Sequence, residues 1–271
     1  MKPRSFDYHR PKTIAEAVEA LAQHGDDARI LAGGQSLIPM LNFRLLEPVA
    51  LIDIRHVPEL DHIRLDGDML EVGAAVTQNR LLAWPDLARH VPLLAVAMPW
   101  VGHFQTRNRG TVCGSIAHAD PSSEIPLSLA MLEGEVVLQS PRGRRVLKAS
   151  EFQTGMLSTA RDSDEMIVAA RFPTTFTGKA AFREVARRHG DYAIVAVGAL
   201  RLPGGEALVG IGGASDRPVV RRFRLDGGDL GAELDALAWE LETYEDLHAS
   251  PRMRRDLVRR LAPTVISELR S

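Results

Sequence analysis

Apolar residues near the N-terminus recur every three or four positions, which is the spacing of one helical face. Ile14, Val18 and Leu21 share this face. Thr13 precedes them and is followed three residues later by a glutamate, a capping-box pattern in which both side chains satisfy unpaired backbone N–H groups. Gly25 is a typical helix stop. The pattern therefore predicts a helix that begins at Thr13 and ends before Gly25.

The next apolar runs are short and rich in β-branched residues. Arg29–Ala32 and Val49–Ile54 each have the length and composition of a buried strand. Residues 36–43 between them have a helical pattern. This alternation predicts a small α/β unit that closes near Pro58.

Apolar runs and turn residues continue to alternate as far as residue 175, where Pro173 and two threonines mark a boundary. The elements that they predict are a strand at Met69–Gly73, a helix capped by Thr77, a helix over 92–98, a helix at Glu124–Leu132, a hairpin of Glu135–Gln139 and Arg144–Leu147, and a strand at Glu165–Phe172.

The last hundred residues have a different pattern, because strands follow one another without helices between them. Ala180–Arg188, Tyr192–Leu202, Ala207–Gly212 and Val219–Leu225 predict an antiparallel meander, and helices follow around 231–241 and 251–269. We therefore expect an α+β protein of three parts: residues 1–58, residues 59–175 and a C-terminal α+β domain over residues 176–271.

Composition excludes several classes of function. The 271 residues carry a formal net charge of −2, which gives no electrostatic reason to expect nucleic acid as a partner. The single cysteine, Cys113, cannot hold an iron–sulfur cluster or form an internal disulfide. No apolar run approaches the ~20 residues that cross a bilayer, and the polar N-terminus lacks the apolar segment of a signal peptide. These features predict a cytoplasmic protein without an integral membrane segment.

Two glycine-containing segments have the chemistry of a phosphate cradle. The first, Ala32-Gly33-Gly34-Gln35-Ser36, joins a predicted strand to a predicted helix. Glycine lets the backbone approach a ligand closely, and successive N–H groups can then point at one anion. The alternative for an isolated glycine pair is a tight turn that binds nothing. Neither G-x-G-x-x-G nor a P-loop occurs in the chain.

The second segment is Thr111-Val112-Cys113-Gly114-Ser115, which is followed by His118 and Asp120. The segment offers hydroxyls and free N–H groups, and the Asp120 carboxylate is able to accept hydrogen bonds from the hydroxyls of a sugar or a ribityl chain. The alternatives are a turn at Asp120-Pro121 and a structural role for His118. Two such loops suit an elongated ligand with two phosphates and a polyol.

The chain as a whole resembles the FAD-binding medium subunits of the molybdenum hydroxylases. The resemblance rests on ordered motifs at family-like spacing: AGGQSLIPMLNFRL, GTVCGSIAHADPSSEIP, RRHGDYAIVAVG and DLHASPRMRRDLVRRL. It implies a two-part FAD-binding fold of the vanillyl-alcohol oxidase (PCMH) type, followed by the C-terminal domain peculiar to these flavoproteins.

The resemblance also implies roles for individual residues. The loop that wraps the FAD pyrophosphate corresponds to Ala32, Gly33, Gly34, Gln35, Ser36 and Leu37. Thr111, Gly114 and Ser115 correspond to the second pyrophosphate loop, and Asp120 to the acidic residue that reaches the flavin's hydroxyls. Tyr192 lies where the family often places a residue near the isoalloxazine ring; its alternative is a strand residue that packs in the meander.

The sequence departs from the family pattern at two places. The family usually has a glycine where this chain has Cys113, so that a Cβ and a sulfur must fit into the second loop. The family's frequent Tyr-Arg pair near the C-terminus is Met253-Arg254 here. Arg107 and Arg109, which precede the second loop, either orient it and offset phosphate charge or lie in a solvated turn.

The resemblance implies a division of labour between subunits. Non-covalent FAD would be bound by this chain, which has no catalytic or metal-binding residues of its own. A large subunit would carry the molybdenum-pterin cofactor, and a small subunit two [2Fe-2S] clusters, in a dimer of heterotrimers. Electrons would pass from molybdenum through the clusters to FAD and on to an external acceptor. The substrate and that acceptor are left open: carbon monoxide, an N-heterocycle, a purine or an aldehyde all fit. A stand-alone FAD oxidase and a non-enzymatic binding module are the alternatives.

Overall fold

The computed structural model describes residues 2–226 and 228–270. The N-terminal part is a three-stranded parallel sheet with strand order β1-β3-β2. Its strands and helices are β1 (Asp7–His9), α1 (Ile14–His24), β2 (Ala28–Leu31), α2 (Leu37–Asn42) and β3 (Ala50–Asp53). The Thr13 hydroxyl accepts a hydrogen bond from the Glu16 N–H at 3.1 Å, and Gly25 ends α1 with φ +53°. The sequence therefore predicted this unit closely, apart from β1.

The middle part is a five-stranded antiparallel sheet with strand order β4-β5-β10-β6-β7. Its strands are β4 (Ile63–Asp66), β5 (Met69–Gly73), β6 (Glu135–Ser140), β7 (Gly143–Lys148) and β10 (Met166–Pro173). The helices of this part are α3 (Gln78–Leu82), α4 (Leu87–His90), α5 (Pro92–Ala97), α6 (Phe104–Arg107), α7 (Val112–His118), α8 (Glu124–Met131) and α9 (Ala149–Phe152). A small hairpin of β8 (Gln153–Gly155) and β9 (Ser158–Thr159) follows α9.

The C-terminal part is the predicted meander, with strand order β11-β12-β13-β14 and antiparallel pairing throughout. Its elements are β11 (Ala180–Val185), β12 (Val195–Leu202), β13 (Glu206–Gly212), β14 (Val219–Arg224), α10 (Leu230–Glu240) and α11 (Pro251–Glu268). Single-turn 3₁₀ helices lie at Gly25–Asp27, Pro58–Leu60, Met98–Trp100 and Pro203–Gly205.

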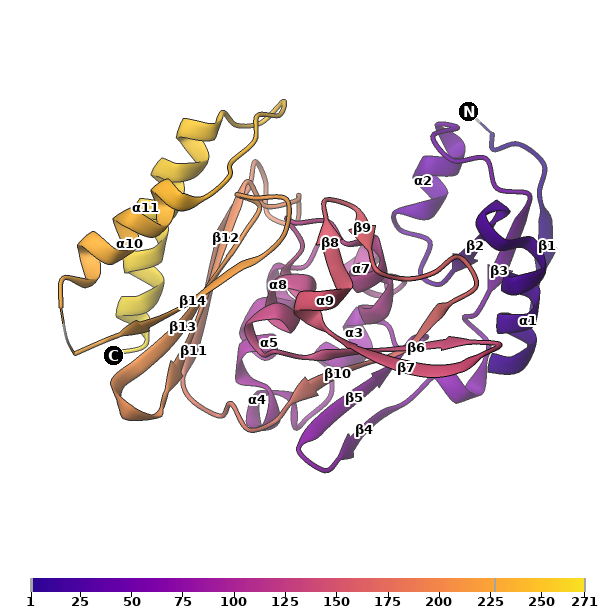
Figure 1. The fold of residues 1–271 in the computed structure, drawn as a ribbon, viewed down its shortest axis with the longest axis horizontal. Coiled ribbons are helices and arrows are strands. Elements are labelled where there is room, and N and C mark those ends of the chain that lie inside the picture. Colours follow the sequence, from indigo (N-terminus) through magenta and orange to yellow (C-terminus); the bar gives the residue numbers. More distant parts are fainter. Residues whose placement is uncertain (1, 227, 271) are drawn as a thin grey trace.

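The C-terminal sheet is covered on both faces. Helices α10 and α11 pack on its outer face, whereas α5 and α8 of the middle part contact the inner face (Figure 1). The alternation of side chains along β12 follows this arrangement, since Val197 and Ala199 join the core under α11 while Ala196 and Leu200 join the core shared by the N-terminal and middle parts. The sheet therefore joins the two cores through one layer.

Two sequence predictions differ from the structure. The segment around Thr111-Val112-Cys113 was expected to be a glycine-rich loop, but Val112–His118 is helix α7 with Thr111 as its N-cap. Strand β12 was expected to begin at Tyr192, but it begins at Val195, so that Tyr192 lies in the connection after β11. Glycine and hydroxyl residues favoured a loop at 111–115, where a helix capped by Thr111 forms instead. The apolar run after Tyr192 favoured an earlier strand start than the structure has.

Candidate cofactor site

The two glycine segments lie against each other although 77 positions separate Gly33 from Gly110. A Cβ placed on Gly33 would lie 2.3 Å from the Arg109 carbonyl oxygen and 2.6 Å from Gly110 Cα. Only glycine fits at such a distance, because no side-chain adjustment relieves a clash with backbone. The first loop follows β2, so the parallel sheet presents its carboxyl edge to the second segment. The first loop thus lies directly against the residues that precede Thr111.

The first loop presents free donors. Gly34 has φ +71°, in the left-handed region, and its carbonyl oxygen accepts the Ile38 N–H at 3.0 Å. Within the described residues, no acceptor takes the N–H groups of Gly34, Gln35 or Ser36. The Gln35 side chain instead folds back and donates to the Gly33 carbonyl oxygen at 3.2 Å. Three successive unpaired N–H groups are what an anion such as a phosphate requires.

The second segment is pinned by strand-like pairing at its start. Thr111 forms an isolated antiparallel bridge with Thr77, and the Gln78 N–H donates to the Gly110 carbonyl oxygen at 2.8 Å. The Thr111 hydroxyl accepts the Gly114 N–H at 3.0 Å, which caps α7. A hydroxyl that accepts one hydrogen bond still has its own proton to donate. Ser115 lies in the same first turns of this helix, next to Gly114.

Cys113 takes no part in the surface of the site. Its side chain points into the core, where it is 2% exposed, and the thiol donates to the Val72 carbonyl oxygen at 3.5 Å. Burial raises the pKa of the Cys113 thiol to about 12. The residue is helical rather than left-handed, so a Cβ is tolerated there. The Cys113 side chain therefore fills space in the core, and it is at the adjacent Gly114 that a side chain would lack room.

Asp120 begins a tight turn after α7. One of its carboxylate oxygens accepts the Ser122 N–H at 2.8 Å, an Asx turn, so the predicted turn is present. The other oxygen, Oδ2, is left for another donor. Ala119, just before, has φ +53° and is fully buried, and its carbonyl oxygen accepts hydrogen bonds from the Gln153 side chain and the Leu157 N–H. These contacts fix the direction in which Asp120 leaves the helix.

Tyr192 reaches the site from the C-terminal sheet. Tyr192 is 57% exposed, and its hydroxyl end lies near the Ser36 side chain of the first loop and the Asp120 carboxylate. Burial of this hydroxyl end and the charge of Asp120 raise the pKa of Tyr192, and the neighbouring Ser36 side chain opposes the rise. Ser36, Asp120 and Tyr192 thus come from three separate parts of the chain and converge on one place. The alternative in which Tyr192 packs within the meander is wrong.

Arg107 orients the approach to the second segment. Its guanidinium donates to the carbonyl oxygens of Val101 and Gly102, each at 2.8 Å. Arg107 is therefore not a residue of a solvated turn. His118 is half-buried, and burial lowers its pKa although Asp120 opposes this. The contacts of Arg107 support a structural role for it.

Sequence reasoning missed two carboxylates beside this site. Glu124 begins α8 and is 6% exposed, and burial raises its pKa to about 7. Glu184 lies on β11, and both of its carboxylate oxygens are buried without a partner among the described residues. Burial, with a smaller contribution from Glu124, raises the pKa of Glu184 to about 8. Nothing in the sequence pattern distinguishes these glutamates from exposed ones.

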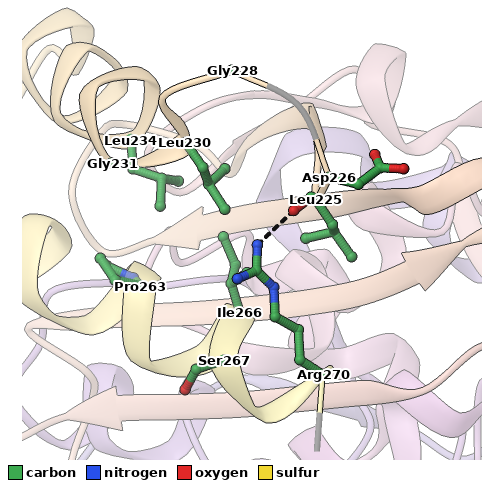
Figure 2. A pocket seen from close by; sticks show the side chains of 10 residues that line it. All are labelled: Leu225, Asp226, Gly228, Leu230, Gly231, Leu234, Pro263, Ile266, Ser267 and Arg270. Atoms are coloured by element: carbon green, nitrogen blue, oxygen red, sulfur yellow. Dashed lines mark hydrogen bonds between the residues drawn. The ribbon is translucent and has the colours of Figure 1, made fainter.

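Other features of the molecule lie elsewhere. A pocket of about 550 Å³ between α10 and α11 is lined by Leu225, Leu230, Leu234, Ile266 and Arg270, among others, and contains none of the residues above (Figure 2). Among the described residues, no group of three His, Cys, Asp or Glu side chains is placed to hold a metal ion. The described part of the chain also has no helix that is long and apolar enough to cross a membrane.

Comparison with known proteins assigns the class. Residues 4–175 match the family described as "FAD binding domain in molybdopterin dehydrogenase". The chain belongs to this family and is a component of an oxidoreductase. The match ends where the predicted C-terminal domain begins.

Individual relatives extend the likeness over the whole chain. Caffeine dehydrogenase subunit beta of Pseudomonas sp. (strain CBB1) is 43% identical over 196 residues, which are 71% of this chain and 66% of that protein. The 6-hydroxypseudooxynicotine dehydrogenase complex subunit alpha of Paenarthrobacter nicotinovorans is 34% identical and aligns with 99% of this chain and 95% of its own. A chain of carbon monoxide dehydrogenase from Hydrogenophaga pseudoflava superposes with a TM-score of 0.91 at 31% identity, covering 98% of both chains. These likenesses confirm the predicted fold class and family.

Proposed function

We propose that this chain is the FAD-binding, electron-transfer subunit of a heterotrimeric molybdenum hydroxylase. The observation that carries the proposal is the contact of Gly33 with Gly110, which brings three unpaired N–H groups and a helix-capping threonine to one place. Donors of this kind suit a diphosphate. FAD supplies the redox chemistry when it is bound, because it accepts and releases electrons.

The residues of this chain bind and orient that cofactor. The loop from Ala32 to Leu37 would hold one side of the diphosphate through its backbone N–H groups, and Thr111, Gly114 and Ser115 would hold the other. Asp120 would accept hydrogen bonds from polyol hydroxyls through the oxygen that its turn leaves free. Tyr192 would cover one face of the isoalloxazine ring. In this proposal FAD is held non-covalently.

The remaining chemistry belongs to partner subunits in this proposal. A small subunit with two [2Fe-2S] clusters would deliver electrons, and a large subunit with the molybdenum-pterin cofactor would hydroxylate the substrate. The relatives named as subunits of caffeine and 6-hydroxypseudooxynicotine dehydrogenases support a multi-subunit arrangement. We propose a dimer of heterotrimers, which the mass of the complex purified from its native host would test.

Expression of the chain alone tests the proposal. The purified chain should bind one equivalent of FAD, visible as flavin absorbance that acid precipitation releases into the supernatant. It should hydroxylate no aldehyde or heterocycle. Unaided hydroxylation by the FAD-loaded chain would favour the stand-alone oxidase instead, and the absence of any flavin binding would favour a binding module. Yellow colour in the acid pellet would contradict the non-covalent site.

A further inference from the structure

Arg254 is a buried cation that the proposed function leaves without a role. It lies on α11, more than fifty residues beyond the last proposed cofactor residue, and is 1% exposed. Burying a guanidinium costs free energy unless its donors are paired, and an apolar residue of similar size often stabilises a core equally well. Stability alone therefore does not explain Arg254, and its contacts indicate what else it does.

Each nitrogen of the Arg254 guanidinium has a hydrogen-bond or ion-pair partner. Nη1 donates to the carbonyl oxygens of both Ile194 and Gly213, each at 2.6 Å, and Nε donates to the Tyr244 carbonyl oxygen at 3.2 Å. Nη2 pairs with the Asp246 carboxylate at 2.6 Å, and the guanidinium lies 4.2 Å from the centre of the Tyr244 ring. The Asp246 carboxylate supplies the counter-charge, while Nη1 makes two equally short contacts with neutral carbonyl groups.

One of those carbonyl groups belongs to the segment that carries Tyr192, and the other belongs to a residue that is hydrogen-bonded to the turn at Asp120. Ile194 is two residues after Tyr192, at the point where β12 begins. Gly213 directly follows β13, and its N–H donates to the Pro121 carbonyl oxygen at 2.8 Å, next to Asp120. A single nitrogen of Arg254 therefore bridges the tyrosine loop to the aspartate turn.

The backbone at this bridge has room for little change. Gly213 has φ +75°, and a Cβ placed on it would lie 2.7 Å from the Ile194 carbonyl oxygen. The two segments are thus in direct contact, and the Arg254 guanidinium on α11 donates a hydrogen bond to each of them. Two carbonyl groups that point toward one another repel unless a donor lies between them. The cation supplies that donor.

We propose that Arg254 is a positioning residue of the flavin site: it holds the Tyr192 loop and the Asp120 turn in one relative arrangement. This inference rests on the proposed function, because it concerns how the flavin's surroundings are fixed. None of the contacts of Arg254 described above is with the two glycine segments. Its effect passes through the backbone of residues 192–194 and 213, and α11 thereby becomes part of the cofactor site.

The test compares Arg254→Lys and Arg254→Met with Arg183→Met in the full chain. Arg183 also joins the C-terminal sheet to α11, through Glu268 at 2.9 Å, but from a half-exposed position on β11, so it is a matched control. Hydrogen exchange of the FAD-free chain should be faster at residues 192–194 in both Arg254 variants and unchanged in the control. If neither Arg254 variant folds by circular dichroism, Asp246→Asn should produce the same local increase.

FAD titration gives the second measurement. Both Arg254 variants should bind FAD about tenfold more weakly, which corresponds to ~1.4 kcal/mol. In a Tyr192→Ala background the further loss from Arg254→Lys should be smaller than tenfold, because the two residues act through one loop. Wild-type exchange and affinity in Arg254→Lys, or effects equal to those of Arg183→Met, would overturn the inference. Failure of the wild-type chain to bind FAD would refute the proposed function, whereas the exchange result would still report whether Arg254 fixes the loop.

Discussion

At the scale of single residues, the closest contact in the site involves Gly33. Gly33→Ala should reduce FAD affinity at least about tenfold, because its methyl group would force the loop away from the Arg109 carbonyl oxygen. FAD titration of the variant measures this loss. Gly155→Ala is a suitable control, since its Cβ would find its nearest neighbour at 3.5 Å and its φ is not positive. Equal losses in both variants would mean that the clash at Gly33 is not what limits binding.

Neighbouring positions in α7 should respond in opposite ways. Cys113→Gly should keep FAD, because the side chain that is removed points into the core, although glycine in a helix costs about 1 kcal/mol of stability. Gly114→Val should weaken FAD retention, since a Cβ there would lie 2.7 Å from the Thr111 hydroxyl that caps the helix. Flavin content after gel filtration compares them. Retention in both variants would place the second loop elsewhere.

The Cys113 thiol should also be inert in the folded chain. Its burial and raised pKa leave almost no thiolate at neutral pH, and the thiolate is the reactive form. A thiol reagent such as Ellman's should therefore react only after denaturant is added. Rapid labelling of the native chain would contradict the packing of α7 against β5.

At the scale of elements, the buried Glu184 on β11 should make the stability of the fold depend on pH. The folded chain holds a proton on Glu184 up to about pH 8, whereas the unfolded chain releases it near the ordinary glutamate value. The folded state therefore binds more protons across this window, and stability falls as pH rises from about 5 to 8. Glu184→Gln should reduce this decline.

Thermal unfolding at pH 5.5, 7 and 8.5 measures the effect. The gain in Tm of Glu184→Gln over wild type should grow with pH, while the exposed Glu245→Gln should follow wild type at every pH. A Tm difference that does not change with pH would show that Glu184 is ionised in the folded chain.

The elements themselves were largely predictable from sequence, whereas their contacts were not. Periodicity and capping residues gave α1, β5 and the β6–β7 hairpin nearly to the residue, because these depend on local pattern. Strands β1 and β4 were missed, since each is short and mostly exposed. Resemblance supplied the site residues, but the Gly33–Gly110 contact, the buried Glu184 and the reach of Arg254 depend on tertiary packing.

At the scale of the whole molecule, FAD should stabilise the chain as one unit. The residues proposed to bind FAD come from all three parts of the sequence, and the C-terminal sheet joins the two cores. A ligand at a hundred times its Kd adds ~2.7 kcal/mol to stability. For a chain of this size that corresponds to a rise in Tm of roughly 5–10 °C.

Calorimetry of the chain with and without FAD tests this expectation. Removal of FAD should shift the entire transition to lower temperature, and its return should restore it. A chain that shows two transitions, of which FAD moves only one, would contradict a site shared among the three parts.

The meeting of Gly33 with Gly110 also sets the order of events during synthesis. The ribosome releases the first loop long before the residues that complete the cradle, and the Tyr192 loop and the Arg254 bridge follow later still. Contacts so distant in sequence form slowly, because a long chain must close before they contribute. With the cofactor site proposed above, the nascent N-terminal segment lacks most of the FAD-binding residues, and FAD would load only after translation has delivered α11.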